Sequence, residues 1–326
     1  MREELQARCE AFIDNREVLK QVYRMENSHL YPVCANIFVA RGVPAREEEL
    51  RRCRDLLKAH TSVFSNFRGS AAMPVVSLLA VSPDPEDKVR RMVDLYGLLR
   101  ESFFGSQYLA LAALMMTELP AQHPDAEMAA RGRTLYNRMK KEYPFLTSGE
   151  DSVMAVLLAY SEKDDDHLIA EMEDCYNRLK TAFRSSNDVQ AASHVLALGP
   201  GSTLEKTARM LSIYEKLQAA GAKYGKYREL SALAALSILP ISPEDAAADM
   251  LDIDDFLSRQ KGYGFWGIDR RTRMMHAALI AADQPVSLPA EAAALSATLA
   301  AIAAQQAAMM SVVITTSASS AASSSH

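Results

Sequence analysis

The chain has 326 residues, of which 49% are hydrophobic and 24% are charged, and its formal net charge is −5 at pH 7. These values are ordinary for a chain that buries a large core, so they exclude disorder of the whole protein. A negative net charge gives no electrostatic reason to expect nucleic acid or an anionic membrane as a partner, although a local basic patch is compatible with it.

The N-terminal segment MREELQARCEAF is charged from its second residue and contains no apolar run. It therefore predicts no secretory signal. The four cysteines, Cys9, Cys34, Cys53 and Cys175, show no C-x-x-C spacing, and two of them lie in amphipathic helical patterns. Buried free thiols in a reducing compartment explain this pattern, so we expect a cytoplasmic protein.

Along the chain, one pattern recurs about every 40 residues. A tyrosine is followed three residues later by Leu or Met in the segments 93–104, 133–145, 173–185 and 211–225, and the equivalent tyrosines are Tyr96, Tyr136, Tyr176 and Tyr214. The Leu or Met position extends the frame to seven units, at Leu19, Leu57, Leu99, Met139, Leu179, Leu217 and Leu257. A period of this length is typical of helical repeat proteins.

Each unit contains two helical patterns of different kinds. The first is amphipathic, as in 168–183, where Leu168, Met172 and Cys175 belong to one apolar stripe. The second is apolar nearly all round, as in SVMAVLLAY at 152–160, and must be covered on both sides. We predict an all-α protein of about seven stacked helical hairpins, with the apolar helices inside. The sequence leaves open whether this α/α solenoid closes into a toroid.

Capping signals mark the ends of these helices. DPED at 84–87 and SPED at 242–245 each place an N-cap before a proline, and S-x-x-E at 202–205 is a capping box. T-x-x-E at 147–150 and N-x-x-Q at 187–190 predict the same device at the start of two inner helices.

After residue 289 the composition becomes rich in alanine and serine. The segment 292–314 carries no charge over a length that could span a bilayer. Two central glutamines and the lack of aromatic or basic anchors argue against insertion, so we expect no membrane partner there. We predict a helical-hairpin repeat domain at 1–285, an Ala-rich C-terminal helix at 286–316 and a disordered Ser/Ala tail at 317–326.

The segment FLTSGEDS at 145–152 joins an outer helix to an inner helix, and hairpin repeats place all such junctions on one edge. This edge is expected to be the most polar surface with aromatic residues. We predict a binding or scaffold module that takes a protein or small-molecule ligand there. The candidate binding residues are Asn66, Arg68, Gln107, Glu150, Asn187, Tyr227, Arg228, Trp266 and Arg270.

The alternative is an α/α-barrel enzyme, a hydrolase or a lyase, that uses carboxylates of the junctions. Glu150, Asp151 and Asp188 could supply an acid and a base, and His194 is a weaker candidate because a lone histidine in an apolar helix is more often a core residue. Phosphate-loop, zinc-protease and nucleophile-elbow motifs do not occur in the sequence. The sequence therefore indicates no metal site, and it leaves the cofactor and the substrate open.

Several segments together resemble an uncharacterised bacterial family known as domain of unknown function 4003. They are ARCEAFIDNREVLK, YPVCANIF, FSNFRG, FLTSGEDS, SSNDVQAASHVLALG and IAAQQAAM. The likeness covers nearly the whole chain. It implies a bacterial, cytoplasmic protein whose shared residues lie largely at the hairpin junctions, and it implies no activity.

Overall fold

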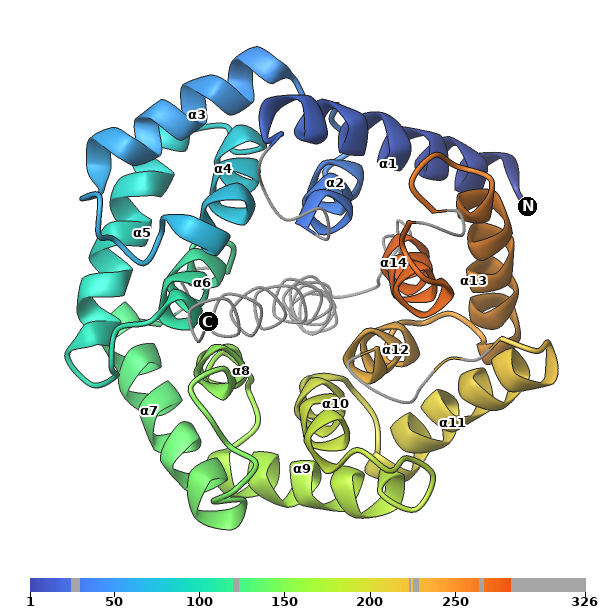
Figure 1. Cartoon of the computed structure of the whole chain (residues 1–326). Helices are drawn as coiled ribbons and strands as arrows, with labels where there is room; N and C mark the ends of the chain where they lie inside the picture. Colours follow the sequence, from blue (N-terminus) through green and yellow to red (C-terminus); the bar gives the residue numbers. More distant parts are fainter. Residues whose placement is uncertain (25–29, 120–122, 223, 225–228, 264–266, 283–326) are drawn as a thin grey trace, which may run out of the picture.

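The computed structural model describes residues 1–24, 30–119, 123–222, 224, 229–263 and 267–282. This part of the chain contains fourteen α-helices, one 3₁₀ turn at Gly69–Ala71 and no strand. The helices alternate along the chain between an outer and an inner position (Figure 1). The prediction of an all-α protein built from seven helical hairpins is confirmed. The predicted C-terminal helix and tail lie outside the described residues.

The outer helices are α1 (Glu3–Val22), α3 (Glu47–His60), α5 (Pro85–Arg100), α7 (Asp125–Glu142), α9 (Asp165–Leu179), α11 (Thr203–Ala219) and α13 (Pro243–Ser258). The inner helices are α2 (Leu30–Ala40), α4 (Ala72–Ala80), α6 (Gln107–Met116), α8 (Asp151–Leu158), α10 (Ser186–Leu198), α12 (Leu230–Ser237) and α14 (Arg270–Ala282). Helix α3 buries only Leu50, Cys53 and Leu57, whereas every residue from 109 to 116 of α6 is buried. The amphipathic and the fully apolar patterns thus mark outer and inner helices.

The first and last hairpins are in contact, so the seven hairpins form a ring in Figure 1. Helix α1 packs against α13 and α14, and α2 packs against α14. The Arg2 guanidinium pairs with Asp249 of α13, and Arg16 Nη2 donates a hydrogen bond to the carbonyl oxygen of Lys261 at 2.6 Å. The question that the sequence left open is therefore answered by contacts between residues at opposite ends of the repeat.

The repeated tyrosine packs against an aromatic residue of the preceding unit. The ring centroids lie 5.0 Å apart for Phe67 and Tyr96, 5.7 Å for Phe103 and Tyr136, 5.1 Å for Tyr143 and Tyr176, and 4.9 Å for Phe183 and Tyr214. Three of the pairs meet edge to face, the arrangement that the ring quadrupoles favour. Four neighbouring hairpin contacts are thus made in the same way, which explains why the tyrosine recurs with the period of the repeat.

The contact between the last unit and the first uses the same position with a different chemistry. In the repeat frame Arg16 occupies the tyrosine position of the first unit, three residues before Leu19. Its guanidinium carbon lies 5.0 Å from the ring centroid of Tyr263, which comes from the last junction. A cation–π contact therefore replaces the aromatic pair where the ring closes.

A second repeated position secures the ends of the inner helices. Arg131 and Arg209 each stand eight residues before the frame Met or Leu. Arg131 donates to the carbonyl oxygens of Ala159 at 2.8 Å and Ser161 at 2.7 Å, beyond the end of α8. Arg209 donates to those of Ser237, Leu239 and Ile241 at the end of α12. Carbonyl groups that have no partner within the helix are satisfied in this way.

In the fifth unit this position holds Glu171, and two lysines take over the role of the arginine. Lys163 Nζ donates to the carbonyl oxygens of Ala197 at 2.8 Å and Gly199 at 2.9 Å, and it lies 2.7 Å from a Glu171 carboxylate oxygen. The buried Lys206 pairs with the other oxygen of Glu171 and donates to Gly199 at 3.1 Å. The end of α10 is thus held by a buried group of two cations around one carboxylate, which we call the Glu171 cluster.

Several local predictions are confirmed by the helix ends. Asp84 and Ser242 accept hydrogen bonds from the backbone N–H groups three residues later, with proline in the first turn, and Ser202 and Glu205 form a reciprocal capping box. All four cysteines are buried and free.

We expect Ala155→Leu to lower the free energy of unfolding by about 1–3 kcal/mol, because it overpacks a close helix contact. Ala155 is fully buried in α8, and a Cβ atom added to Gly132 of α7 would lie 3.5 Å from its carbonyl oxygen and 3.1 Å from the Cα of Val156. Denaturant titration measures the change. Ala130→Leu, on the exposed side of α7, is the matched control. An unchanged midpoint for Ala155→Leu would place this residue away from the α7 contact.

Candidate functional site

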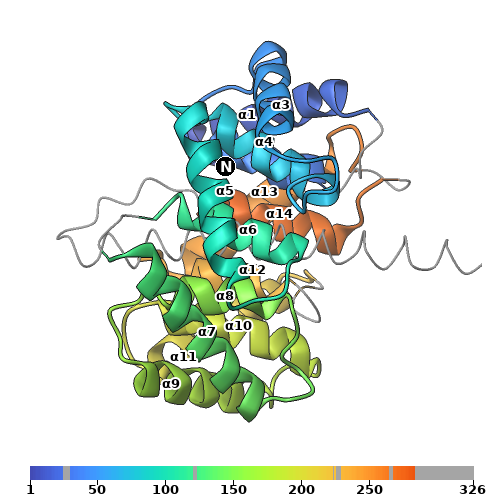
Figure 2. The same cartoon turned by 90° about the vertical axis from the view of Figure 1, so that its left-hand side faces the viewer.

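The segments that join each outer helix to the following inner helix lie side by side, and we call this side of the ring the junction edge. It comprises the described residues of 61–71, 101–106, 143–150, 180–185, 220–229 and 259–269. The Ser70 hydroxyl donates to the side-chain oxygen of Gln107 at 2.5 Å, and the Gln190 amide donates to the Thr147 hydroxyl at 3.0 Å. Consecutive units therefore meet at this edge. Figure 2 shows the ring from the side, with α5 and α7 among the helices that face the viewer.

Two predicted binding residues, Asn66 and Arg68, hold the second junction in place. The Asn66 amide donates to the Tyr96 hydroxyl at 2.6 Å. Arg68 donates to the carbonyl oxygens of Lys58 at 2.9 Å and Thr61 at 2.6 Å, which end α3. Both side chains are half-buried, so they fix the loop and still present part of their surface at the edge.

Asp151 is the first residue of α8, and its side chain is only 11% exposed. Burial raises the pKa of this carboxyl from 3.8 to about 7; the Ser148 N–H, which donates to Oδ2 at 2.7 Å, lowers it, and the neighbouring Glu150 raises it. Lys140 also lowers the pKa. The carboxyl is therefore partly protonated near neutral pH, where it can act as an acid or a base.

His194 of α10 faces Asp151 across the contact between two inner helices. Its Nδ1 atom lies 3.7 Å from Asp151 Oδ1 and has no hydrogen-bond partner among the described residues. Burial lowers the pKa of His194 to about 4, so the ring is neutral at pH 7. An approach of about 1 Å would let a protonated Asp151 donate to this nitrogen. Sequence reasoning named both residues, and the fold brings them together.

The predicted capping box at 147–150 is wrong. Helix α8 begins at Asp151, three residues later than a box with its N-cap at Thr147 requires, and Glu150 makes no capping hydrogen bond with its side chain. The Thr147 hydroxyl is buried instead, where it donates to the carbonyl oxygen of Met139 at 3.1 Å. Asp151 reaches back to the backbone N–H of Ser148 and so takes the part that the sequence assigned to Glu150.

The second predicted box, at 187–190, is wrong for a related reason. Helix α10 begins at Ser186, and its N-cap Ser185 makes no side-chain capping bond. Gln190 is buried and donates to Thr147 of the preceding junction. An amide that reads as a local cap therefore serves a contact between neighbouring units.

The remaining predicted residues have different surroundings. Asn187 is exposed and Asp188 is half-buried, both in the first turn of α10. Arg270 is exposed, with Nε donating to Asp254 Oδ2 at 3.1 Å and Nη1 to the carbonyl oxygen of Gly221 at 3.2 Å. Tyr227, Arg228 and Trp266 lie outside the described residues.

Sequence reasoning missed the most exposed apolar side chains of this edge. Phe64, Phe104 and Phe145 belong to three consecutive junctions and are 97%, 93% and 99% exposed. Each of these junctions carries a second aromatic residue, and it is this other residue that pairs with the next unit. An aromatic residue beyond the one that the repeat requires was therefore the signal in the sequence.

A cation lies against the backbone of each of these three loops. Arg68 donates to the carbonyl oxygen of Thr61 in the loop of Phe64. A Cβ atom on Gly105 would collide with the Arg100 guanidinium, which places that cation next to Gly105, the residue after Phe104. Lys140 Nζ donates to the carbonyl oxygens of Pro144 at 2.6 Å and Thr147 at 2.5 Å, on either side of Phe145. We call the three loops with their phenylalanines and cations the Phe row.

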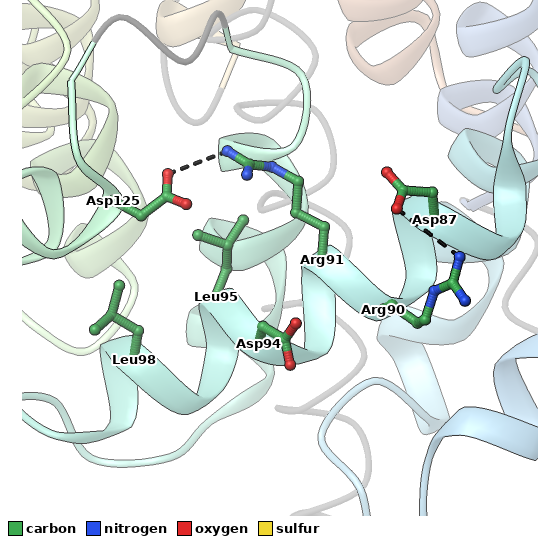
Figure 3. A pocket seen from close by; sticks show the side chains of 7 residues that line it. All are labelled: Asp87, Arg90, Arg91, Asp94, Leu95, Leu98 and Asp125. Carbon is green, nitrogen blue, oxygen red and sulfur yellow. Dashed lines mark hydrogen bonds and ion pairs between the residues drawn. The ribbon is translucent and has the colours of Figure 1, made fainter.

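A hollow of about 430 Å³ lies on the outer wall between α5 and the start of α7 (Figure 3). It is lined by Asp87, Arg90, Arg91, Asp94, Leu95, Leu98 and Asp125. Arg91 lies 3.1 Å from Asp125, and Arg90 lies 3.9 Å from Asp87, so opposite charges of the lining pair with each other. The hollow includes none of the site residues predicted from the sequence.

Two further classes of site are absent from the described part of the chain. No group of three or more His, Cys, Asp or Glu side chains that could hold a metal ion occurs there. No helix in the same residues has both the length and the apolar character needed to cross a bilayer.

Comparison with known proteins agrees with the resemblance found in the junction segments. Residues 15–310 match the family described as "Protein of unknown function (DUF4003)". The chain is also similar to "Uncharacterized protein YeaA" of Bacillus subtilis (strain 168), with 26% identity over 234 residues, which cover 68% of each chain. No solved structure matches the chain.

Proposed function

Because the chain belongs to the DUF4003 family, whose description assigns no activity, we propose its function from its own surface: it is a binding module that works through the junction edge. The observation that carries this proposal is the Phe row. Phe64, Phe104 and Phe145 lie in the junctions of three consecutive units and contribute almost nothing to the core.

Energetics favour a binding role for these side chains. Burying one phenylalanine in an apolar environment is worth about 1.5–3 kcal/mol, and that gain is unused when the side chain stands in water. Single exposed apolar residues are ordinary on protein surfaces, but several on one face indicate an interaction site. Among the exposed large hydrophobic residues in the described part of the chain, the three most exposed all belong to this edge.

The other predicted binding residues fit around the row as its polar surroundings. Gln107 starts α6 directly after the Phe104 loop, Glu150 lies in the next junction, and Asn187 lies in the first turn of α10, directly after the junction 180–185. Tyr227, Arg228, Trp266 and Arg270 are proposed to extend the same surface. The four free, buried cysteines support a reducing compartment, and we place the module in the cytoplasm.

Photo-crosslinking in living cells tests the binding role without knowledge of the partner. We expect Phe104→p-benzoylphenylalanine, and the same change at Phe64 and Phe145, to give adducts on irradiation. Leu204→p-benzoylphenylalanine is the matched control, because Leu204 is apolar, 60% exposed and far from the junctions, at the start of α11. Equal adducts at all four positions, or none at the three junction positions, would contradict the proposal.

An α/α-barrel enzyme is the second candidate, and one observation favours it. Asp151 carries a buried carboxyl with a pKa of about 7 beside the unpartnered Nδ1 atom of His194. Perturbed carboxyls next to a neutral histidine are typical of sites that move protons. Glu150 and Asp188 are proposed as accessory carboxylates of that site, whose test is given in the Discussion.

A further inference from the structure

The three phenylalanines of the Phe row stand apart from one another on separate loops. Each loop belongs to a different hairpin, and each ring is almost completely surrounded by solvent. A protein partner would need three pockets at fixed spacing to bury them, because aromatic anchors at protein interfaces fill well-packed pockets. A lipid surface accepts all three rings without preformed pockets, since acyl chains rearrange around them.

The charges of these loops also favour a lipid surface as the partner. The segments 58–70, 100–107 and 140–150 contain five lysines and arginines but three acidic residues, Glu101, Glu142 and Glu150, whereas the whole chain has a net charge of −5. Arg68 and Lys140 donate hydrogen bonds to carbonyl oxygens, which carry no net charge. Lys58 pairs with Asp55 at 3.0 Å, and Lys140 interacts with the carboxyl of Asp151. The three segments nevertheless hold more basic than acidic residues, in contrast to the chain as a whole.

Exposed aromatic rings on loops that also hold basic residues match the layers of a membrane interface. Apolar rings enter the boundary of the acyl chains, while lysines and arginines meet the phosphate groups of anionic lipids. Resting on the proposed binding role of the junction edge, we propose that the partner of the Phe row is the surface of an anionic phospholipid membrane. The finding that no described helix can span a bilayer concerns crossing and is compatible with this surface contact.

Co-sedimentation of the full chain with vesicles tests this proposal. We expect the protein to sediment with vesicles of phosphatidylglycerol and phosphatidylcholine, to stay in solution with phosphatidylcholine alone, and to dissociate as salt is raised. The triple variant Phe64→Ser, Phe104→Ser, Phe145→Ser should lose more than about tenfold of its partitioning. Leu204→Ser is the matched control and should sediment like the wild type. Because all four side chains are exposed, the thermal midpoints should not change.

Four outcomes would overturn the lipid partner. They are no sedimentation with the anionic vesicles, equal sedimentation with neutral vesicles, wild-type binding by the triple variant, and equal losses in the triple variant and Leu204→Ser. The photo-crosslinking experiment separates this failure from failure of the binding role. Protein adducts at Phe104 without vesicle binding would leave a binding module with a protein partner. Absence of both adducts and vesicle binding would contradict the proposal that the chain is a binding module.

Discussion

Glu171→Ala is expected to lower the free energy of unfolding by about 3–5 kcal/mol, the typical effect of removing one partner from a buried ion pair. In the Glu171 cluster this carboxylate lies between Lys163 and Lys206, and the side chain of Lys206 is almost completely buried. Alanine would leave the buried Lys206 amino group, whose pKa burial already lowers to about 7, without the carboxylate that pairs with it. Urea denaturation at neutral pH measures the difference.

Two further variants show whether the loss of stability in Glu171→Ala comes from the interaction of Glu171 with Lys206. Glu173→Ala, two residues along the same helix and exposed, should change stability by no more than about 0.5 kcal/mol. The double variant Glu171→Leu, Lys206→Met should recover most of the loss, because apolar residues of similar size remove the unpaired charge. A double variant as unstable as the sum of its single changes would show that the two residues do not interact.

Much of this architecture could be predicted because it is encoded in local patterns. The apolar stripe of the outer helices and the fully apolar inner helices follow from helical periodicity alone, and the recurring tyrosine gave the length of the unit. The reason for the tyrosine could not be predicted. It depends on the aromatic residue of the preceding unit, as for Tyr96 and Phe67, which the chain brings together only when hairpins stack.

Ring closure and the Glu171 cluster were beyond the sequence for the same physical reason. Arg16 and Tyr263 are in contact although nearly the whole length of the repeat domain separates them in the sequence, and no local pattern predicts such a contact. Glu171 replaces an arginine of the neighbouring units, yet only the structure shows that Lys163 and Lys206 compensate for it. Substitutions at a repeated position thus become informative once the partners of the usual residue are known.

For the candidate site, the sequence predicted the edge better than the roles of its residues. Thr147 and Glu150 match a capping box, but capping depends on where the helix starts, and α8 starts at Asp151, whose side chain accepts the hydrogen bond from the Ser148 N–H. The exposure of the three phenylalanines was harder still to predict, because the sequence pattern is equally compatible with a second aromatic residue of a junction being buried in the core. Only the packing of the first one, such as Phe103 against Tyr136, shows that Phe104 remains in solvent.

The carboxyl of Asp151 makes stability depend on pH in a direction opposite to that of most acidic residues. Its folded-state pKa, about 7, is raised above the ordinary 3.8, so the folded protein resists its ionisation. Stability from this group is complete below about pH 4 and is lost as the pH rises through 7. We therefore expect Asp151→Asn to raise the free energy of unfolding by up to roughly 4 kcal/mol above pH 7 and hardly at all near pH 4.

The geometry allows asparagine to keep the local contacts while removing the charge. Its side-chain oxygen can accept the Ser148 N–H, and its amide can donate toward His194 Nδ1. In the unfolded protein His194 becomes charged below its ordinary pKa of 6.5, but in the folded protein only below about 4. This difference affects wild type and variant alike. Denaturation midpoints of both proteins, measured from about pH 4 to above pH 7, isolate the contribution of Asp151. Glu150→Gln, the adjacent and more exposed carboxylate, is the control and should show a much smaller trend, because Glu150 contributes less than burial to the raised pKa of Asp151.

The outcome decides between the two roles of this site. A large gain in stability for Asp151→Asn at high pH would mean that the fold retains a carboxyl that destabilises it, which is typical of residues kept for function. If vesicle binding by that variant is also unchanged, the carboxyl serves a task separate from the Phe row, and the enzyme candidate gains. If the variant is no more stable than wild type at any pH, Asp151 already shares its proton with His194 in a satisfied pair. The carboxyl would then be part of the packing between α8 and α10 and would no longer support a catalytic site.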